Sequence, residues 1–187
     1  MILKQFNNIK KDRIDKIEKE LEIKFPEDYR KFLLKYNGGI VEKNGENSIR
    51  VQNIEEEIII DTLFGIVEEE EADISYWNQQ MKEDMLDSAL IIGDDIIQGF
   101  IVIICYGENK GVYYWDDAYN FKNSDDETHT LEFGAVNDMT SNCYMTIDND
   151  TSKIYMVASD LETAFNFNLN DLAEKESFPS ITATTVT

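Results

Sequence analysis

The apolar residues between positions 14 and 39 recur at helical spacing and form the clearest pattern in the chain. Ile14, Ile17 and Leu21 follow the i, i+3, i+7 spacing that places three side chains on one face of a helix. A second helix is predicted to begin at Pro26, because proline has no N–H to lose at the first helical position. Apolar residues at i, i+3, i+4 and i+7 predict its buried face, namely Tyr29, Phe32, Leu33 and Tyr36.

The second helix is predicted to end at Asn37, which Gly38 and Gly39 follow. Asparagine and glycine tolerate the left-handed backbone conformation of a C-terminal cap, so we expect a positive φ at Gly38 or Gly39. The polar stretch 41–48 follows, and its Asn-Gly pair at 44 and 45 predicts a hairpin.

The rest of the pattern predicts a sheet with two further helices. Ile74, Trp77, Met81 and Met85 have helical spacing. The capping box that begins at Ser159 predicts a last helix with four inward positions: Leu161, Phe165, Asn168 or Leu169, and Leu172. Apolar runs at 89–92 and 100–106 predict the centre of the sheet. Other strands are expected at 49–54, 58–60, 112–116, 131–136, 143–147 and 153–157. The predicted class is α+β: a mostly antiparallel sheet of about six or more strands, with helices packed on one side.

Length and composition fit one domain. The 187 residues, 42% hydrophobic and 11% aromatic, can bury a substantial core. We expect a single domain over 1–176 with an elaboration around 122–157, and a tail at 177–187. No signal peptide is apparent, and the longest apolar run, 100–106, is too short to span a bilayer. We therefore expect a cytoplasmic protein, in which Cys105 is a buried free thiol and forms no disulfide with Cys143.

Charge is unevenly distributed along the chain. The formal net charge is −21, yet residues 1–50 hold 12 Lys and Arg against 9 Asp and Glu, while residues 51–187 hold 5 against 29. Such a surface repels phosphate groups, which disfavours direct binding to nucleic acid or to anionic membranes. It would attract a basic protein partner and speed the encounter with it. Plain solubility is the alternative explanation of the same composition.

Residues that usually carry catalysis or bind metal are scarce. His129 is the only histidine and has no nucleophile motif nearby, so we interpret it as a surface-loop residue. Two cysteines and one histidine cannot form a four-ligand zinc site without carboxylates. The segment that begins at Asp148 starts like a calcium loop, but Lys153 occupies the position that needs glycine. No phosphate-binding or dinucleotide fingerprint is present. We therefore expect no cofactor, no metal and no enzymatic activity.

Two acidic pairs could in principle supply catalytic carboxylates: Asp94 with Asp95, and Asp116 with Asp117. Adjacent residues of a strand point to opposite faces of the sheet, so neither pair is expected to act as a unit. We interpret these four residues as exposed acids at turns and strand ends.

Several of these motifs together resemble the SUKH superfamily, the Smi/Knr-type domains. The most specific part lies in the second helix and its stop, with Phe25, Pro26, Asp28, Tyr29, Phe32, Leu33, Tyr36, Asn37, Gly38 and Gly39. Further motifs follow in the family's order at 63–65, at 92–95 with Gly99, at 111–116 and at 158–165. The chain departs from the pattern at Phe100, where the family usually has Asn or Asp, and in the long segment 122–155.

The resemblance implies a function in protein binding. Many bacterial proteins of the superfamily neutralise polymorphic toxins by direct binding, which implies a non-enzymatic immunity protein. Together with the charge distribution, the resemblance leads us to expect a toxin domain, for example of the nuclease type, as the basic partner. A regulatory or scaffolding interaction module is the alternative, and an enzyme is the third. Immunity implies one tight complex, whereas a scaffold implies several weaker partners. Our predicted partner-binding residues are the acids expected at turns and strand ends: Glu68, Glu69, Glu70, Glu71, Asp94, Asp95, Asp116 and Asp117.

Overall fold

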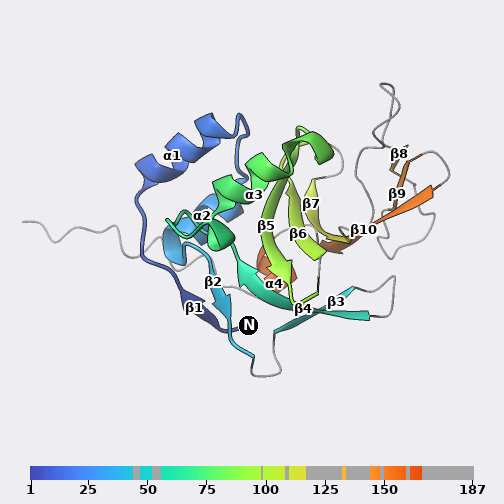
Figure 1. Ribbon diagram of the computed structural model, residues 1–187, viewed down its shortest axis with the longest axis horizontal. Coiled ribbons are helices and arrows are strands. Elements are labelled where there is room, and N and C mark those ends of the chain that lie inside the picture. The colour runs from blue at the N-terminus through green and yellow to red at the C-terminus, as the bar shows by residue number, and fades with distance from the viewer. Residues whose placement is uncertain are drawn as a thin grey trace, which may run out of the picture.

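The computed structural model describes residues 1–43, 47–51, 56–97, 99–107, 110–116, 132–133, 144–147, 150–158 and 161–165 (Figure 1). Its helices are α1 (Lys11–Glu20), α2 (Glu27–Lys35), α3 (Ile74–Gln80), α4 (Leu161–Phe165) and the short 3-10 helices η1 (Glu70–Ala72) and η2 (Lys82–Asp84). Its strands are β1 (Leu3–Gln5), β2 (Gly39–Val41), β3 (Ser48–Val51), β4 (Glu56–Leu63), β5 (Ala89–Asp95), β6 (Gly99–Ile104), β7 (Gly111–Asp116), β8 (Glu132–Phe133), β9 (Tyr144–Ile147) and β10 (Asp150–Ala158).

The strands form one ten-stranded sheet in the order β1-β2-β4-β5-β6-β7-β10-β9-β8, and β3 pairs with β4 outside this path. The pairings within it are antiparallel. Figure 1 shows α1, α2 and α3 grouped together beside β5. The expected α+β class with a mostly antiparallel sheet is therefore confirmed. Strands β8, β9 and β10 extend the same sheet within the segment that we expected to be an elaboration.

The pairing around β4 corrects one expectation. We predicted a hairpin across 41–48, but β2 and β3 each pair with β4 and not with each other. The Asn-Gly pair itself lies outside the described residues. Pairing of β2 with β4 brings Gly39 opposite Leu63, so the residues that follow α2 lie beside the end of β4.

Helices α1 and α2 bury the faces that their periodicity predicts. Ile14 of α1 is fully buried, as are Tyr29 and Leu33 of α2, and Phe32 is 1% exposed. Tyr36 is only partly buried at the end of the helix. Helix α2 begins one residue later than predicted, because Pro26 has an extended ψ of 150° and is the N-cap. Its carbonyl still accepts the first helical hydrogen bond, from the Arg30 N–H at 3.0 Å.

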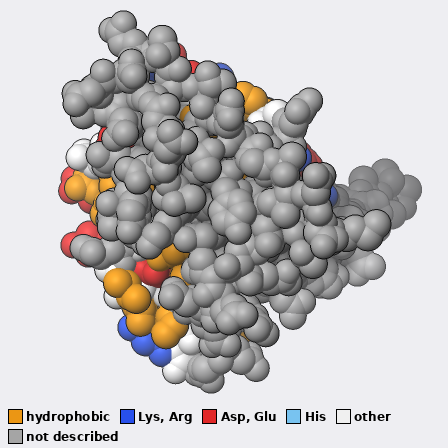
Figure 2. All heavy atoms as spheres, turned by 90° about the vertical axis from the view of Figure 1, so that its right-hand side faces the viewer, with side chains coloured by type: hydrophobic (Ala, Val, Ile, Leu, Met, Phe, Trp, Pro, Cys, Tyr) orange, Lys and Arg blue, Asp and Glu red, His pale blue; other side chains and the backbone are white. Residues whose placement is uncertain are grey.

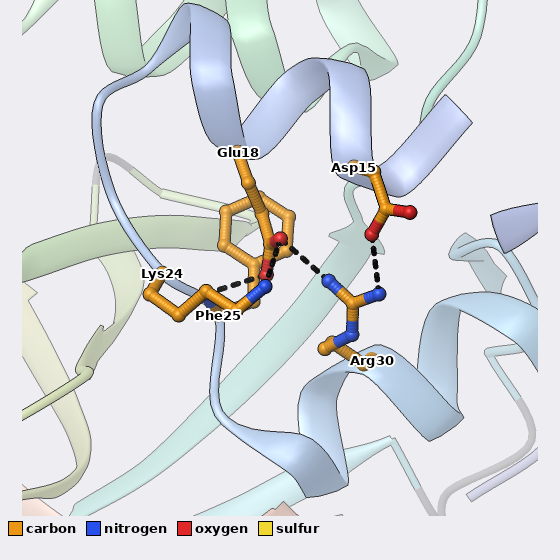
Figure 3. A network of polar contacts seen from close by, with 5 residues as sticks. All are labelled: Asp15, Glu18, Lys24, Phe25 and Arg30. Carbon is orange, nitrogen blue, oxygen red and sulfur yellow. Dashed lines mark hydrogen bonds and ion pairs between the residues drawn. The ribbon is translucent and has the colours of Figure 1, made fainter. Parts of the chain in front are cut away.

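A polar network joins α1 to α2 (Figure 3). The Arg30 guanidinium bonds Asp15 and pairs with Glu18, each at 2.6 Å, and Lys24 and the Phe25 N–H also donate to Glu18. Desolvation raises the pKa of Glu18, but the hydrogen bonds from Arg30, Lys24 and Phe25 outweigh it, and the pKa lies below its usual value. Because each buried charge in this network has a partner, the network fixes the two helices relative to each other.

Helix α3 packs on the sheet through an aromatic row. Trp77 stacks on Phe64 with ring centres 5.8 Å apart and contacts Phe100 at 5.4 Å. Phe100 in turn contacts Trp115, its partner across β6 and β7. Helix α3 ends at Gln80, although the predicted apolar stripe continues to Met85. Met85 lies beyond η2 and is still buried, with 4% of its surface exposed. In α4, two of the predicted inward residues, Leu161 and Phe165, are buried, and the others, at 168, 169 and 172, lie outside the described residues.

Candidate functional site

Asn37 ties the end of α2 to the segment that follows β4. Its side chain is 1% exposed; Nδ2 donates to the Asn7 carbonyl at 2.8 Å and to the Ile66 carbonyl at 3.3 Å, while Oδ1 accepts from the Ile66 N–H at 2.9 Å. Gly38 follows with φ +75°, as predicted, and a Cβ there would overlap the backbone of Leu63 and Phe64. The first two motifs of the resemblance therefore meet in space and fix the start of the acidic loop.

The acidic loop, residues 67–72, is held at both ends. Asp73 caps α3, because its Oδ1 accepts from the Tyr76 N–H at 3.0 Å, and its Oδ2 accepts from the Val67 N–H at 3.1 Å. The Trp77 Nε1–H donates to the Glu71 carbonyl at 3.0 Å. The carboxylates between these anchors are all exposed, namely Glu68, Glu69, Glu70 and Glu71. The loop thus presents four acids from a fixed backbone.

A hollow of about 590 Å³ separates the acidic loop from the β1-β2-β4 end of the sheet. Its lining includes the apolar side chain of Ile40 and the acids Asp61, Glu69 and Glu71. Asp61 pairs with Lys43 at 3.2 Å, an exposed ion pair of the kind that contributes little to stability. The hollow therefore combines an apolar wall with a negatively charged rim.

A second hollow, of about 450 Å³, lies on the other side of the same loop. Glu68 and Glu69 share it with two basic residues at the start of α1, Lys10 and Arg13. The charge around Glu68 is therefore mixed, whereas that around Glu71 is acidic.

Asp94 lies on the sheet face that adjoins the first hollow. It is opposite Thr62, and Thr62 is in turn opposite Ile40 on β2. Its Oδ1 accepts from the Thr62 N–H at 2.9 Å, beside a bulge at which Asp61 is the extra residue. Desolvation raises the pKa of Asp94, and repulsion from Asp61 and Asp95 raises it further. The hydrogen bond from the Thr62 N–H lowers the pKa, but by less, so that it lies at about 7. Asp94 therefore changes charge near neutral pH.

Asp95 is not the exposed turn acid that we predicted, because it is 8% exposed. Its Oδ1 accepts from the N–H groups of Ile97 and Gly99, each at 2.8 Å, and its Oδ2 accepts from the Tyr114 hydroxyl at 2.8 Å. A carboxylate with both oxygens satisfied inside the protein holds the β5–β6 turn in place. The structure thus assigns Asp95 to the turn and leaves Asp94 on the other face.

The isoleucine face comprises Ile40 (47% exposed), Ile59 (38%) and Ile96 (47%), and the exposed Ile97 (79%) follows Ile96 in the β5–β6 turn. Ile60 is opposite Asp95, and both are buried. The residues that flank this pair, Ile59 and Ile96, are joined by a backbone hydrogen bond of 3.0 Å. Because side chains alternate along a strand, both project to the face that also carries Asp94. Figure 2 shows hydrophobic side chains beside acidic and basic ones at its lower left edge.

The structure does not bring all the predicted site residues together. Glu69 and Glu71 line the first hollow, and Asp94 lies on the sheet face that adjoins it. Glu68 lines the second hollow, and Asp95 is buried. Asp116 ends β7 opposite Gly99, its side chain is not described, and Asp117 lies outside the described residues. Sequence reasoning missed the isoleucine face. Its signal was the pair of isoleucines at 96 and 97 within a turn, where polar residues are usual.

The other candidate chemistry stays a prediction. His129, Cys143 and the segment that resembles a calcium loop fall wholly or partly outside the described residues. Among the residues that are described, no three His, Cys, Asp or Glu side chains lie close enough to hold a metal ion. Burial raises the pKa of the Cys105 thiol to about 12, as expected for a buried free cysteine. Within the same part of the chain, no helix is long and apolar enough to cross a membrane.

Comparison with known proteins identifies a family. Residues 8–166 match the sequence model of the SMI1 / KNR4 family (SUKH-1), which covers most of the chain. No curated protein matches, and no solved structure does.

Proposed function

The chain belongs to the SMI1 / KNR4 family (SUKH-1), and from this premise we propose that it is a non-enzymatic immunity protein that binds and neutralises a toxin domain. The family membership supports an immunity-like protein or an interaction module. The choice of a toxin, of the nuclease type with a basic nucleic-acid-binding surface, is our proposal.

The observation that carries this proposal is the acidic rim of the first hollow. Glu69 and Glu71 stand exposed on a loop whose backbone is anchored at Asp73, and Asp61 faces them from β4. A basic surface that normally binds an anionic substrate would find carboxylates at a fixed spacing there. Such an arrangement speeds association and selects against acidic partners.

Neutralisation would follow from occupation alone. A protein that covers the substrate-binding surface of a toxin needs no catalytic group, and the charge between 51 and 187 would oppose the approach of nucleic acid to the complex. A regulatory or scaffolding module of the same family is the second candidate, and it differs in having several weaker partners.

The experiment first seeks a toxin gene next to the gene for this chain, and then measures association of the purified chain with that toxin domain after its catalytic residue is inactivated. A variant with Glu68, Glu69, Glu70 and Glu71 changed to Gln is compared with wild type at several salt concentrations. At low salt we expect its association rate to fall about tenfold or more, and its salt dependence to flatten.

A matched control removes four exposed acids elsewhere, by changing Glu20, Glu22, Glu83 and Asp87 to their amides. This control alters the net charge equally and should change the association rate much less. Equal effects of the two variants would leave only a general charge effect. No binding of the wild-type chain to the toxin domain would refute immunity.

A further inference from the structure

We propose that Ile59, Ile96 and Ile97 form the apolar anchor of the partner interface, and that the partner inserts an apolar side chain ringed by Lys or Arg there. This inference rests on the proposed function for the identity of the partner. It adds the surface that holds the complex together once charge has brought the two proteins close.

The anchor is already ordered in the free protein. Asp95 accepts hydrogen bonds from the N–H groups on both sides of the turn, at Ile97 and at Gly99, and the Tyr114 hydroxyl bonds the same carboxylate. The Tyr114 ring also packs so closely on Gly99 that a Cβ there would overlap it. A surface that is fixed before binding loses little conformational entropy when a partner arrives.

The exposure of these isoleucines has no structural explanation within the described residues. Turn positions usually hold Gly, Asn, Asp, Ser or Pro, because these residues suit the backbone or keep polar groups hydrated. Ile97 instead leaves 79% of its surface exposed, and Ile96 in the same turn is joined to Ile59 of β4 by a backbone hydrogen bond. Contiguous exposed apolar residues bordered by polar groups are typical of protein-binding surfaces.

The surrounding charges select the partner. Asp94 is on the same sheet face as Ile59 and Ile96, and Asp61 is two residues along β4 from Ile59. Lys43 pairs with Asp61, and the rim of the hollow also carries Glu69 and Glu71. A second copy of this chain would bring another net charge of −21 to these carboxylates, which disfavours self-association. An apolar centre with an acidic rim therefore fits a basic protein domain.

The test compares Ile97→Ser and Ile96→Ser with Tyr106→Ser, using the same catalytically inactivated toxin domain as the probe. Tyr106 is 52% exposed and follows the opposite end of β6, so its replacement also removes exposed apolar surface, together with the hydrogen bond from its hydroxyl to the Asp87 carbonyl. We expect each isoleucine variant to weaken binding about tenfold or more, mainly through faster dissociation. The association rate, its salt dependence and the melting temperature should stay at wild-type values, and Tyr106→Ser should bind normally.

Two results would overturn the anchor while leaving immunity intact: wild-type affinity in both isoleucine variants, or a larger loss in Tyr106→Ser than in either. Sedimentation velocity of the chain alone could give a third result of this kind. A dimer that the Ile97→Ser change abolishes would show that a second copy occupies this surface. A wild-type chain that does not bind the toxin domain would refute the proposed function and this partner together.

Discussion

Asn37 makes the connection between α2 and the acidic loop, and replacing it should be more costly than replacing any other polar residue of comparable size in the site. Asn37→Ala removes three hydrogen bonds at once. The substitution leaves the N–H and carbonyl of Ile66 and the carbonyl of Asn7 without their partner.

The magnitude follows from burial and backbone conformation. An unsatisfied buried polar group costs about 1–3 kcal/mol, and the short bonds at 2.8 and 2.9 Å should dominate over the one at 3.3 Å. Asn37 also has φ +51°, a left-handed conformation in which alanine is disfavoured by about 1–2 kcal/mol. We therefore expect Asn37→Ala to lower the free energy of unfolding by about 3–5 kcal/mol, a large fraction of the roughly 5–15 kcal/mol typical of a domain.

Asn78 offers a matched control within the same molecule. Its side chain also makes three bonds, donating to the carbonyls of Ile74 and Ile91 and accepting from the Ile91 N–H, all at 2.8 Å. Asn78 is only partly buried and lies in α3, where alanine is a good helix former. Asn78→Ala should therefore cost only about 1–2 kcal/mol, because water can replace part of what is lost.

Urea unfolding monitored by tryptophan fluorescence measures the free energy of unfolding of both variants. Amide hydrogen exchange adds a local readout: the Ile66 N–H should exchange faster in Asn37→Ala by more than the loss of global stability explains. A free energy of unfolding for Asn37→Ala within about 1 kcal/mol of wild type would contradict this role of Asn37, as would a loss no larger than that of Asn78→Ala.

Three further predictions concern the core and the buried acids. Phe32→Ala should cost about 3–5 kcal/mol in urea unfolding, because its ring is 1% exposed and stacks on Tyr29 at 5.8 Å; wild-type stability would contradict the helical-face assignment. The folded protein retains a proton on Asp94 between about pH 4 and 7 that the unfolded chain has released, so stability should fall as pH rises through that window. Asp94→Asn should remove this decline and raise the free energy of unfolding at pH 8 by about 1–3 kcal/mol, with allowance for solvent screening. If the free energy of unfolding varied with pH in the same way in both proteins, Asp94 would not be the cause of the decline. Tyr114→Phe should cost about 1.5–3 kcal/mol, since it removes a donor to the buried Asp95 carboxylate, and it should speed exchange of the Gly99 amide; unchanged exchange there would show that the turn does not depend on this bond.

The sequence by itself determined the features that depend on local physics. The helical faces around Ile14 and Phe32 follow from a period of 3.6 residues, and the left-handed stop at Gly38 follows from conformational freedom at a single residue. Apolar runs located most of the strands, and charge counting marked the acidic stretch that holds Glu68 to Glu71. Family membership was also recognisable, because its most specific motif is a contiguous helix and its cap.

Only the tertiary structure decided which side chains share a surface. Asp94 and Asp95 are neighbours in sequence, yet one lies on the sheet face that adjoins the acidic hollow and the other is buried under a turn. Alternation along β5 places the two side chains on opposite faces, but only the packed sheet decides which of the two faces is covered. The contact between Asn37 and Ile66 spans 29 residues. No local pattern encodes that contact, because it depends on how β2 and β4 pair.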